Sequence, residues 1–139
     1  MKKFFKKIPT GVLTLLTLIL ICYVSLDDNP FDVNDVQLFY GADKVVHAIM
    51  YGFLTMVMIY EMTKGLYFFK PNWQLYICLI AFNCLFSTLI ESLQELMDLG
   101  RCYDIYDIIA NCSGVIIGFL LMKFILLDII IDKMTSFDD

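Results

Sequence analysis

Residues 105–122 read IYDIIANCSGVIIGFLLM, and this stretch decides the fold of the chain. Its length and apolar character are typical of a helix that crosses a bilayer. Polar and small residues interrupt the apolar run at helical spacing, namely Asp107, Asn111, Gly114 and Gly118. An ionisable residue that faced lipid at this depth would be costly. We therefore expect this face of the helix to pack against other membrane-spanning helices.

The rest of the chain contains further apolar segments with the length of membrane-spanning helices. Apolar segments lie at about residues 8–26, 44–63, 75–97 and 104–127. The composition agrees, with 60% hydrophobic residues and a mean hydropathy of +0.74. These features predict an all-α membrane protein, a bundle of four transmembrane helices, with residues 1–139 as a single domain and no separate soluble part. The net charge of −5 argues against nucleic acid as a partner.

The first apolar segment is interpreted as an uncleaved span. It follows a basic stretch at residues 1–7, as a signal peptide would, but its apolar run is longer than the 7–15 residues of a signal-peptide core. No small-residue cleavage site follows it. We therefore expect residues 8–26 to remain in the protein and to cross the membrane.

The distribution of basic residues predicts the orientation. With the N-terminus in the cytoplasm and four alternating helices, eight of the ten basic residues fall on the cytoplasmic side, and only Lys44 and Arg101 fall outside. This asymmetry follows the positive-inside rule and places both termini in the cytoplasm of a bacterial inner membrane. The external end then carries a net charge of −8 and the internal end +3. We expect the external face to attract cations, either metal ions or a cationic part of a ligand.

Polar residues also enter the second and third segments near their external ends. Asp43, His47 and Tyr51 recur at intervals of four in the second segment, and Glu91 and Gln94 share a face of the third. At about 1.5 Å per residue, His47, Glu91 and Asp107 each lie roughly one turn below the external boundary. Facing these groups toward lipid would be costly, whereas pairing them with each other, with Arg101 or with water lowers that cost. We expect them to converge in an external cleft.

The ordered set of polar residues resembles the VanZ-like family of small bacterial membrane proteins. The residues that carry the resemblance are Asp43, Lys44, His47, Tyr51, Glu91, Gln94, Gly100, Arg101, Asp104, Asp107, Asn111, Gly114 and Gly118. They cover residues 43–118, more than half of the chain. Members of this family are linked to low-level resistance to the glycopeptide antibiotic teicoplanin. The resemblance thus implies a role at the cell envelope and in antibiotic resistance, but it names no reaction.

The chemistry of the side chains selects His47, Glu91 and Asp107 as candidate catalytic residues. The ordinary pKa of a histidine suits proton transfer, and burial would raise the pKa of the Glu91 carboxyl. The candidate binding residues are Asp43, Lys44, Tyr51, Gln94, Arg101, Asp104 and Asn111. Structural interpretations stand beside these: Glu91 in a salt bridge with Arg101, His47 as a hydrogen-bonded residue at a helix end, and Asp104 as a helix cap.

Three functions remain open from the sequence. The first is a membrane enzyme that acts on a lipid-linked or cell-envelope amphiphile, with acid–base groups or a divalent cation such as magnesium, manganese or zinc. The second is a non-catalytic binder or transporter of such an amphiphile, for example a lipid or lipoglycopeptide. The third is a structural accessory subunit in which the polar layer fixes the helix register. In each case the lipid bilayer is a partner.

Overall fold

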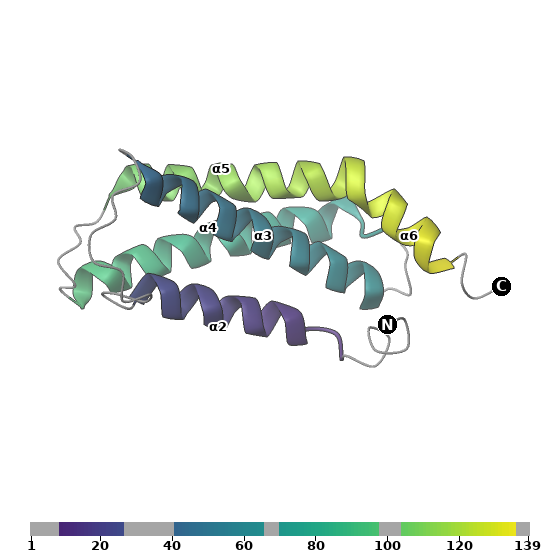
Figure 1. The fold of residues 1–139 in the computed structure, drawn as a ribbon, viewed down its shortest axis with the longest axis horizontal. Helices are drawn as coiled ribbons and strands as arrows, with labels where there is room; N and C mark the ends of the chain where they lie inside the picture. The colour runs from purple at the N-terminus through teal and green to yellow at the C-terminus, as the bar shows by residue number, and fades with distance from the viewer. Residues whose placement is uncertain (1–8, 27–40, 66–69, 98–103, 136–139) are drawn as a thin grey trace.

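The computed structural model describes residues 9–26, 41–65, 70–97 and 104–135, and all the elements within these ranges are helical. Four helical rods lie side by side along the long axis of the molecule (Figure 1). The first three are α2 (Val12–Leu26), α3 (Ala42–Gly65) and α4 (Trp73–Leu96). The fourth is continuous through α5 (Ile105–Leu121), one π-helical turn η1 (Met122–Leu126) and α6 (Leu127–Thr135).

Three of the four rods are long and apolar enough to cross a membrane, namely Lys44–Gly65, Trp73–Leu96 and Ile105–Asp132. The all-helical fold and the multi-pass membrane character predicted from sequence are therefore confirmed. Helix α2 has 15 residues, which is short for a span on its own. It begins at Val12, whereas the sequence predicted a span from residue 8, and residues 1–8 lie outside the described part of the chain.

Glycines bring α3 and α5 together along their length. A Cβ atom on Gly114 would lie 2.0 Å from the carbonyl oxygen of Ala48, and one on Gly118 would lie 2.3 Å from that of Gly52. Only a residue without a side chain allows the two backbones to approach so closely. The close packing expected of Gly114 and Gly118 is confirmed, and it fixes the register between the two helices.

Polar contacts hold α2 against the other helices at both of its ends. At the N-terminus of α2, the Glu61 carboxylate accepts hydrogen bonds from the backbone N–H groups of Leu13 and Thr14, at 3.1 and 2.9 Å. At the C-terminus, the Gln94 side-chain amide donates to the backbone carbonyl of Ser25 at 2.7 Å. Because a helix leaves unpaired N–H groups at its start and unpaired carbonyls at its end, these bonds satisfy groups that would otherwise be orphaned.

Large apolar side chains cover the outside of the bundle. Leu85, Ile77 and Ile49 are 72%, 62% and 65% exposed, as expected for side chains that face lipid rather than water. The interior in turn contains fully buried polar residues such as Asn83 and Thr55. We define the site end of the bundle as the end at which α2 and α4 finish and at which α3 and α5 begin.

Candidate functional site

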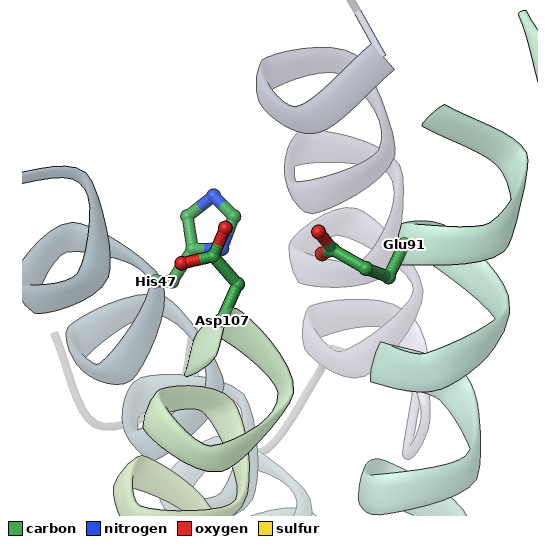
Figure 2. A group of neighbouring side chains, drawn as sticks. All are labelled: His47, Glu91 and Asp107. Carbon is green, nitrogen blue, oxygen red and sulfur yellow. The ribbon is translucent and has the colours of Figure 1, made fainter. Parts of the chain in front are cut away.

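Three side chains from three helices meet at the site end of the bundle. His47 comes from the beginning of α3, Glu91 from the last part of α4, and Asp107 from the first turn of α5. One ligand-type atom of each, a ring nitrogen or a carboxylate oxygen, lies within 4.8 Å of those of the other two. Figure 2 shows the three side chains pointing into the space between their helices. We call this group the His–Glu–Asp cluster.

The cluster lies below the surface rather than on it. Glu91 is only 4% exposed, the side chain of Asp107 is 14% exposed, and the Nδ1 atom of His47 is buried. Ionisable groups are rarely held in this way unless they are paired or functional, because desolvation penalises their charged forms. The convergence that the sequence predicted for these three residues is therefore present in the structure.

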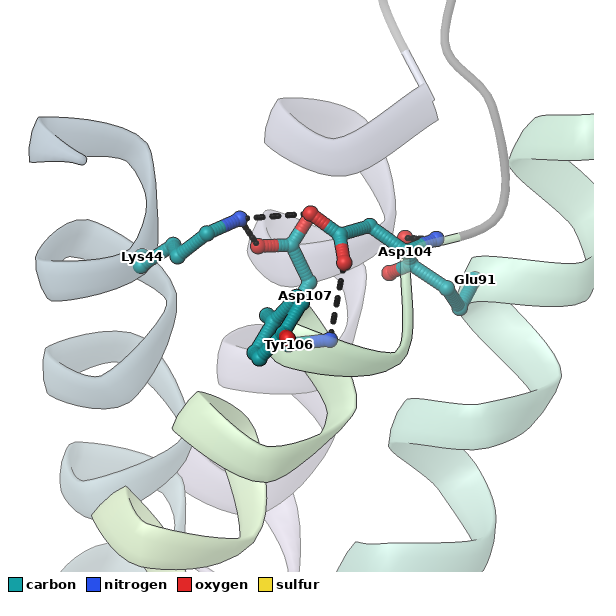
Figure 3. Close-up of polar contacts among 5 residues, drawn as sticks. All are labelled: Lys44, Glu91, Asp104, Tyr106 and Asp107. Carbon is teal, nitrogen blue, oxygen red and sulfur yellow. Dashed lines mark hydrogen bonds and ion pairs between the residues drawn. The ribbon is translucent and has the colours of Figure 1, made fainter. Parts of the chain in front are cut away.

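Lys44 connects the cluster to its outer neighbour Asp104. The Lys44 ammonium donates hydrogen bonds to Asp104 at 2.7 Å and to Asp107 at 2.6 Å, as drawn in Figure 3. The backbone N–H of Asp104 also donates a long hydrogen bond of 3.5 Å to the Glu91 carboxylate. The Lys44 ammonium thus pairs with two carboxylates, and the carboxylate of Glu91 lies beside the Asp104 backbone. Carboxylates outnumber ammonium groups among the described residues at this place, a composition that suits a cation.

Asp104 is the N-cap of α5. Its carboxylate accepts a hydrogen bond of 2.8 Å from the backbone N–H of Tyr106, which confirms the capping role expected from the sequence. The hydrogen bond from Lys44 lowers the pKa of the Asp104 carboxyl below its ordinary value, and the bond from Tyr106 acts in the same direction. Asp104 therefore stays charged at neutral pH, and it holds the Lys44 ammonium beside the cluster.

The remaining residues expected at the site occupy different positions. Asn111 is 1% exposed and lies one helical turn below Asp107 on α5, and Tyr51 is 1% exposed and lies one turn below His47 on α3. No described residue hydrogen-bonds the Tyr51 hydroxyl or the Asn111 Oδ1 atom. Gln94 instead contacts Ser25 of α2. The side chain of Asp43 and all of Arg101 lie outside the described part of the structure.

The His–Glu–Asp cluster offers the ligands of a divalent cation. One imidazole nitrogen and two carboxylates suit zinc, manganese or magnesium, whose bonds to such ligands are about 2.0–2.2 Å long. Ligand atoms within 4.8 Å of one another need only small side-chain rotations to reach a shared ion. Without an ion, the same groups can exchange protons with a bound molecule, because a histidine and a buried carboxyl group are suitable acid–base groups.

The buried polar residues that were not identified from the sequence include Glu61 and Asn83. Glu61 is 2% exposed, and it contacts α2 at the far end of the bundle from the cluster. Asn83 is fully buried in the middle of α4, where its amide donates to the Leu79 carbonyl and contacts the Met58 sulfur. The only sequence signal for either residue is that it is polar within an apolar segment, and this does not reveal which group the residue contacts.

One family model matches the chain. The model is described as VanZ/LLP1 and matches residues 4–127. This range includes α2, α3, α4 and α5, and hence every helix that contributes to the cluster. No curated protein and no solved structure matches the chain.

Proposed function

This chain belongs to the VanZ/LLP1 family, and we propose that it binds or chemically modifies the head group of a lipid-linked or cell-envelope amphiphile at the site end of the bundle. Membership in the family agrees with the resemblance that the ordered polar residues indicate. The observation that carries the proposal is the meeting of His47, Glu91 and Asp107 within 4.8 Å at one end of a multi-pass membrane protein. A site in this position is reached from the head-group region of the bilayer.

The proposed orientation places the N-terminus in the cytoplasm of a bacterial inner membrane and the cluster at its external face. The excess of basic residues at the opposite end of the bundle supports this choice, since Lys64, Lys70 and Lys123 all lie near that end. In this orientation the substrate is an amphiphile of the outer leaflet. An effect on teicoplanin susceptibility then arises from a change in the envelope component that this antibiotic meets.

The chemistry of the cluster favours an amphiphile with a charged or hydrogen-bonding head group. His47 and Glu91 serve as acid–base groups, or together with Asp107 they would hold a divalent cation, which would supply Lewis-acid chemistry to an oxygen-rich head group. Lys44 binds the anionic part of the head group, and Arg101, which lies outside the described residues, is a second candidate for this role. Lys44 would exchange its hydrogen bond to Asp107 for one to the ligand.

A lipid and envelope-precursor profile tests this function. A strain that lacks the protein is complemented with the wild type, with Glu91→Gln, or with the control Glu95→Gln, whose side chain is exposed on the same helix. Accumulation of one amphiphile in the deletion and Glu91→Gln strains, but not in the control strain, indicates an enzyme. Redistribution of an amphiphile between leaflets without a new or accumulated species indicates a binder or transporter.

The structural-subunit hypothesis predicts a different result. If the polar layer only fixes helix register, Glu91→Gln alters the amount of folded protein and the phenotype to the same extent. Normalising each lipid profile to the amount of protein in the membrane separates a loss of function from a loss of folded protein. An unchanged profile in folded Glu91→Gln protein would contradict the proposed function.

A further inference from the structure

A groove runs along the seam between α3 and α5 on the surface of the bundle. Its volume is about 460 Å³, within the range of ligand pockets, and its lining is apolar except for Lys44 and Ser113. Its lining includes small residues such as Ala48 and Ala110 and the large apolar residues Phe53 and Ile117, which are 52% and 55% exposed. In a membrane protein such a groove is open to hydrocarbon chains rather than to water.

The length of the groove matches one leaflet of a bilayer. On α3 its lining extends from Lys44 to Met56, which corresponds to about 18 Å at 1.5 Å per residue. On α5 it extends from Ala110 to Leu121, about 17 Å by the same measure. Half of the hydrocarbon core of a bilayer is about 15 Å thick. The groove therefore accommodates a single extended chain that starts at the membrane surface and ends near the midplane.

The polar end of the groove adjoins the His–Glu–Asp cluster. Lys44 lines the groove, and its ammonium contacts both Asp104 and Asp107. A chain that lies in the groove thus places its head group beside Lys44 and the cluster. The opposite, deep end is formed by Met56 and Leu121 and carries no polar group.

We propose that this groove is the chain-binding subsite of the amphiphile, holding one hydrocarbon chain of a lipid whose head group lies at the cluster. This inference rests on the proposed function. It restricts the ligand to molecules that can place one hydrocarbon chain, about as long as one leaflet is thick, in the groove between α3 and α5. Gly114 and Gly118, the two glycines at the close approach of α3 and α5, also line this groove.

Photolabelling of the full-length protein in phosphatidylcholine vesicles tests the proposal. The probe is hexadecyl phosphate with a diazirine at the end of its chain, and the labelled residues are mapped by mass spectrometry. We expect labelling to concentrate on Met56 and Leu121 over Phe82 and Leu85, which face lipid on α4. Even labelling of all lipid-facing residues would overturn the proposal. The alternative occupant is a second copy of the chain. In that case labelling of Met56 and Leu121 would fall as the protein concentration in the vesicle is raised, and this result would also overturn the proposal.

A variant that fills the groove provides the matched comparison. Ala110→Phe should reduce labelling of Met56 and Leu121 by about tenfold, since the added ring takes up space in the groove and the chain loses contacts with its lining. Ala81→Phe adds the same group on the exposed face of α4 and should leave the labelling unchanged. Ser113→Phe repeats the test at an exposed position of the groove. Labelling that is equal in the groove variants and the control would contradict the proposal.

The photolabelling result tests the groove proposal separately from the lipid profile, which tests the proposed function. If Glu91→Gln changes the lipid profile while labelling is even over the surface, the groove proposal fails and the head-group function stands. If labelling is confined to the deep end but the Glu91→Gln profile is normal, the head-group function fails and the chain subsite stands.

Discussion

Lys44 is the residue that joins two acidic groups at the start of α5. Its ammonium lies 2.7 Å from Asp104 and 2.6 Å from Asp107, so one positive charge is shared between a helix cap and a member of the cluster. Both partners are partly open to solvent, which limits what the pairs contribute to stability. Their main effect is to fix the start of α5, and with it the direction in which Asp107 points.

The pairing of Asp104 with Lys44 predicts a pH dependence of stability. Because the folded-state pKa of Asp104 is lowered, the pair stabilises the fold above the ordinary pKa of 3.8, and this contribution is lost as the pH falls through the folded-state pKa. Asp104→Asn keeps an oxygen that can cap α5 but removes the charge. Its melting temperature in detergent should lie slightly below that of the wild type at pH 7, and this difference should shrink as the pH falls below about 3.8 and vanish below the folded-state pKa. A difference that is the same at pH 7 and pH 3 would contradict this assignment.

Glu61 provides a second prediction for a single residue. Replacing it with Gln removes the charge from two hydrogen bonds to the N-terminus of α2 and should cost about 1.5–3 kcal/mol of local stability. Hydrogen exchange at the Leu13 and Thr14 amides measures the effect, and both amides should exchange faster in the variant. Amides in the middle of α4, such as that of Asn83, should be unaffected and serve as the control. Equal exchange at Leu13 and Thr14 in both proteins would show that Glu61 does not hold α2.

The sequence predicts some of these residues better than others. The convergence of His47, Glu91 and Asp107 could be predicted from sequence. Helical spacing shows which residues share one face of a helix, and chain topology shows how deep in the membrane each residue lies. Glu61 could not, since its partners are backbone groups of a helix 47 and 48 residues away, and no pattern of letters records that contact. The same limit applies to Gln94, which was grouped with the site but bonds the end of α2.

At the level of elements, the contact between α3 and α5 determines the geometry of the site. It holds His47 and Asp107 on facing helices, and it creates the groove beside them. The spacing of Gly114 and Gly118 predicts a close approach, but not the partner helix. That the partner is α3, with Ala48 and Gly52 at the crossing, follows only from the tertiary structure.

A bulkier residue at this crossing should separate the two helices. Gly114→Ala would place a methyl group 2.0 Å from the Ala48 carbonyl oxygen, and neither backbone can move without displacing its helix. We expect a loss of about 1–3 kcal/mol or more in the free energy of unfolding, measured by denaturant titration in mixed micelles. Gly65→Ala is the control, because its added group would meet only the end of the Thr10 side chain, the methyl group at 3.2 Å and the hydroxyl oxygen at 3.8 Å. Equal stability of the two variants would contradict the packing described for α3 and α5.

The helix ends show where sequence patterns lose accuracy. The apolar pattern predicted that the last span would end near residue 127, whereas the rod continues through η1 and α6 to Thr135. Asp128 and Asp132 are polar, but they lie on an exposed part of the helix and do not interrupt it. A change in composition therefore marked the end of the apolar span, not the end of the helix.

At the level of the whole molecule, the orientation in the membrane decides which compartment the site faces. Alkaline phosphatase, which is active only outside the cytoplasm, reports this when it is fused after Gly65 or after Leu96. The excess of basic residues at the far end of the bundle predicts low activity after Gly65 and high activity after Leu96. The reverse pattern would place the His–Glu–Asp cluster at the cytoplasmic face and would exclude an external substrate.

We infer that side chains from α3, α4 and α5 form one ligand-binding site, and a manganese titration tests this inference most directly. Electron paramagnetic resonance of the purified protein measures bound Mn²⁺ in the wild type, Glu91→Gln and the control Glu95→Gln. If the cluster holds the cation, the wild type and the control bind one ion with the same affinity. Glu91→Gln should then bind it at least about tenfold more weakly. Equal binding by all three proteins, or binding by none, would contradict a cation site made of His47, Glu91 and Asp107.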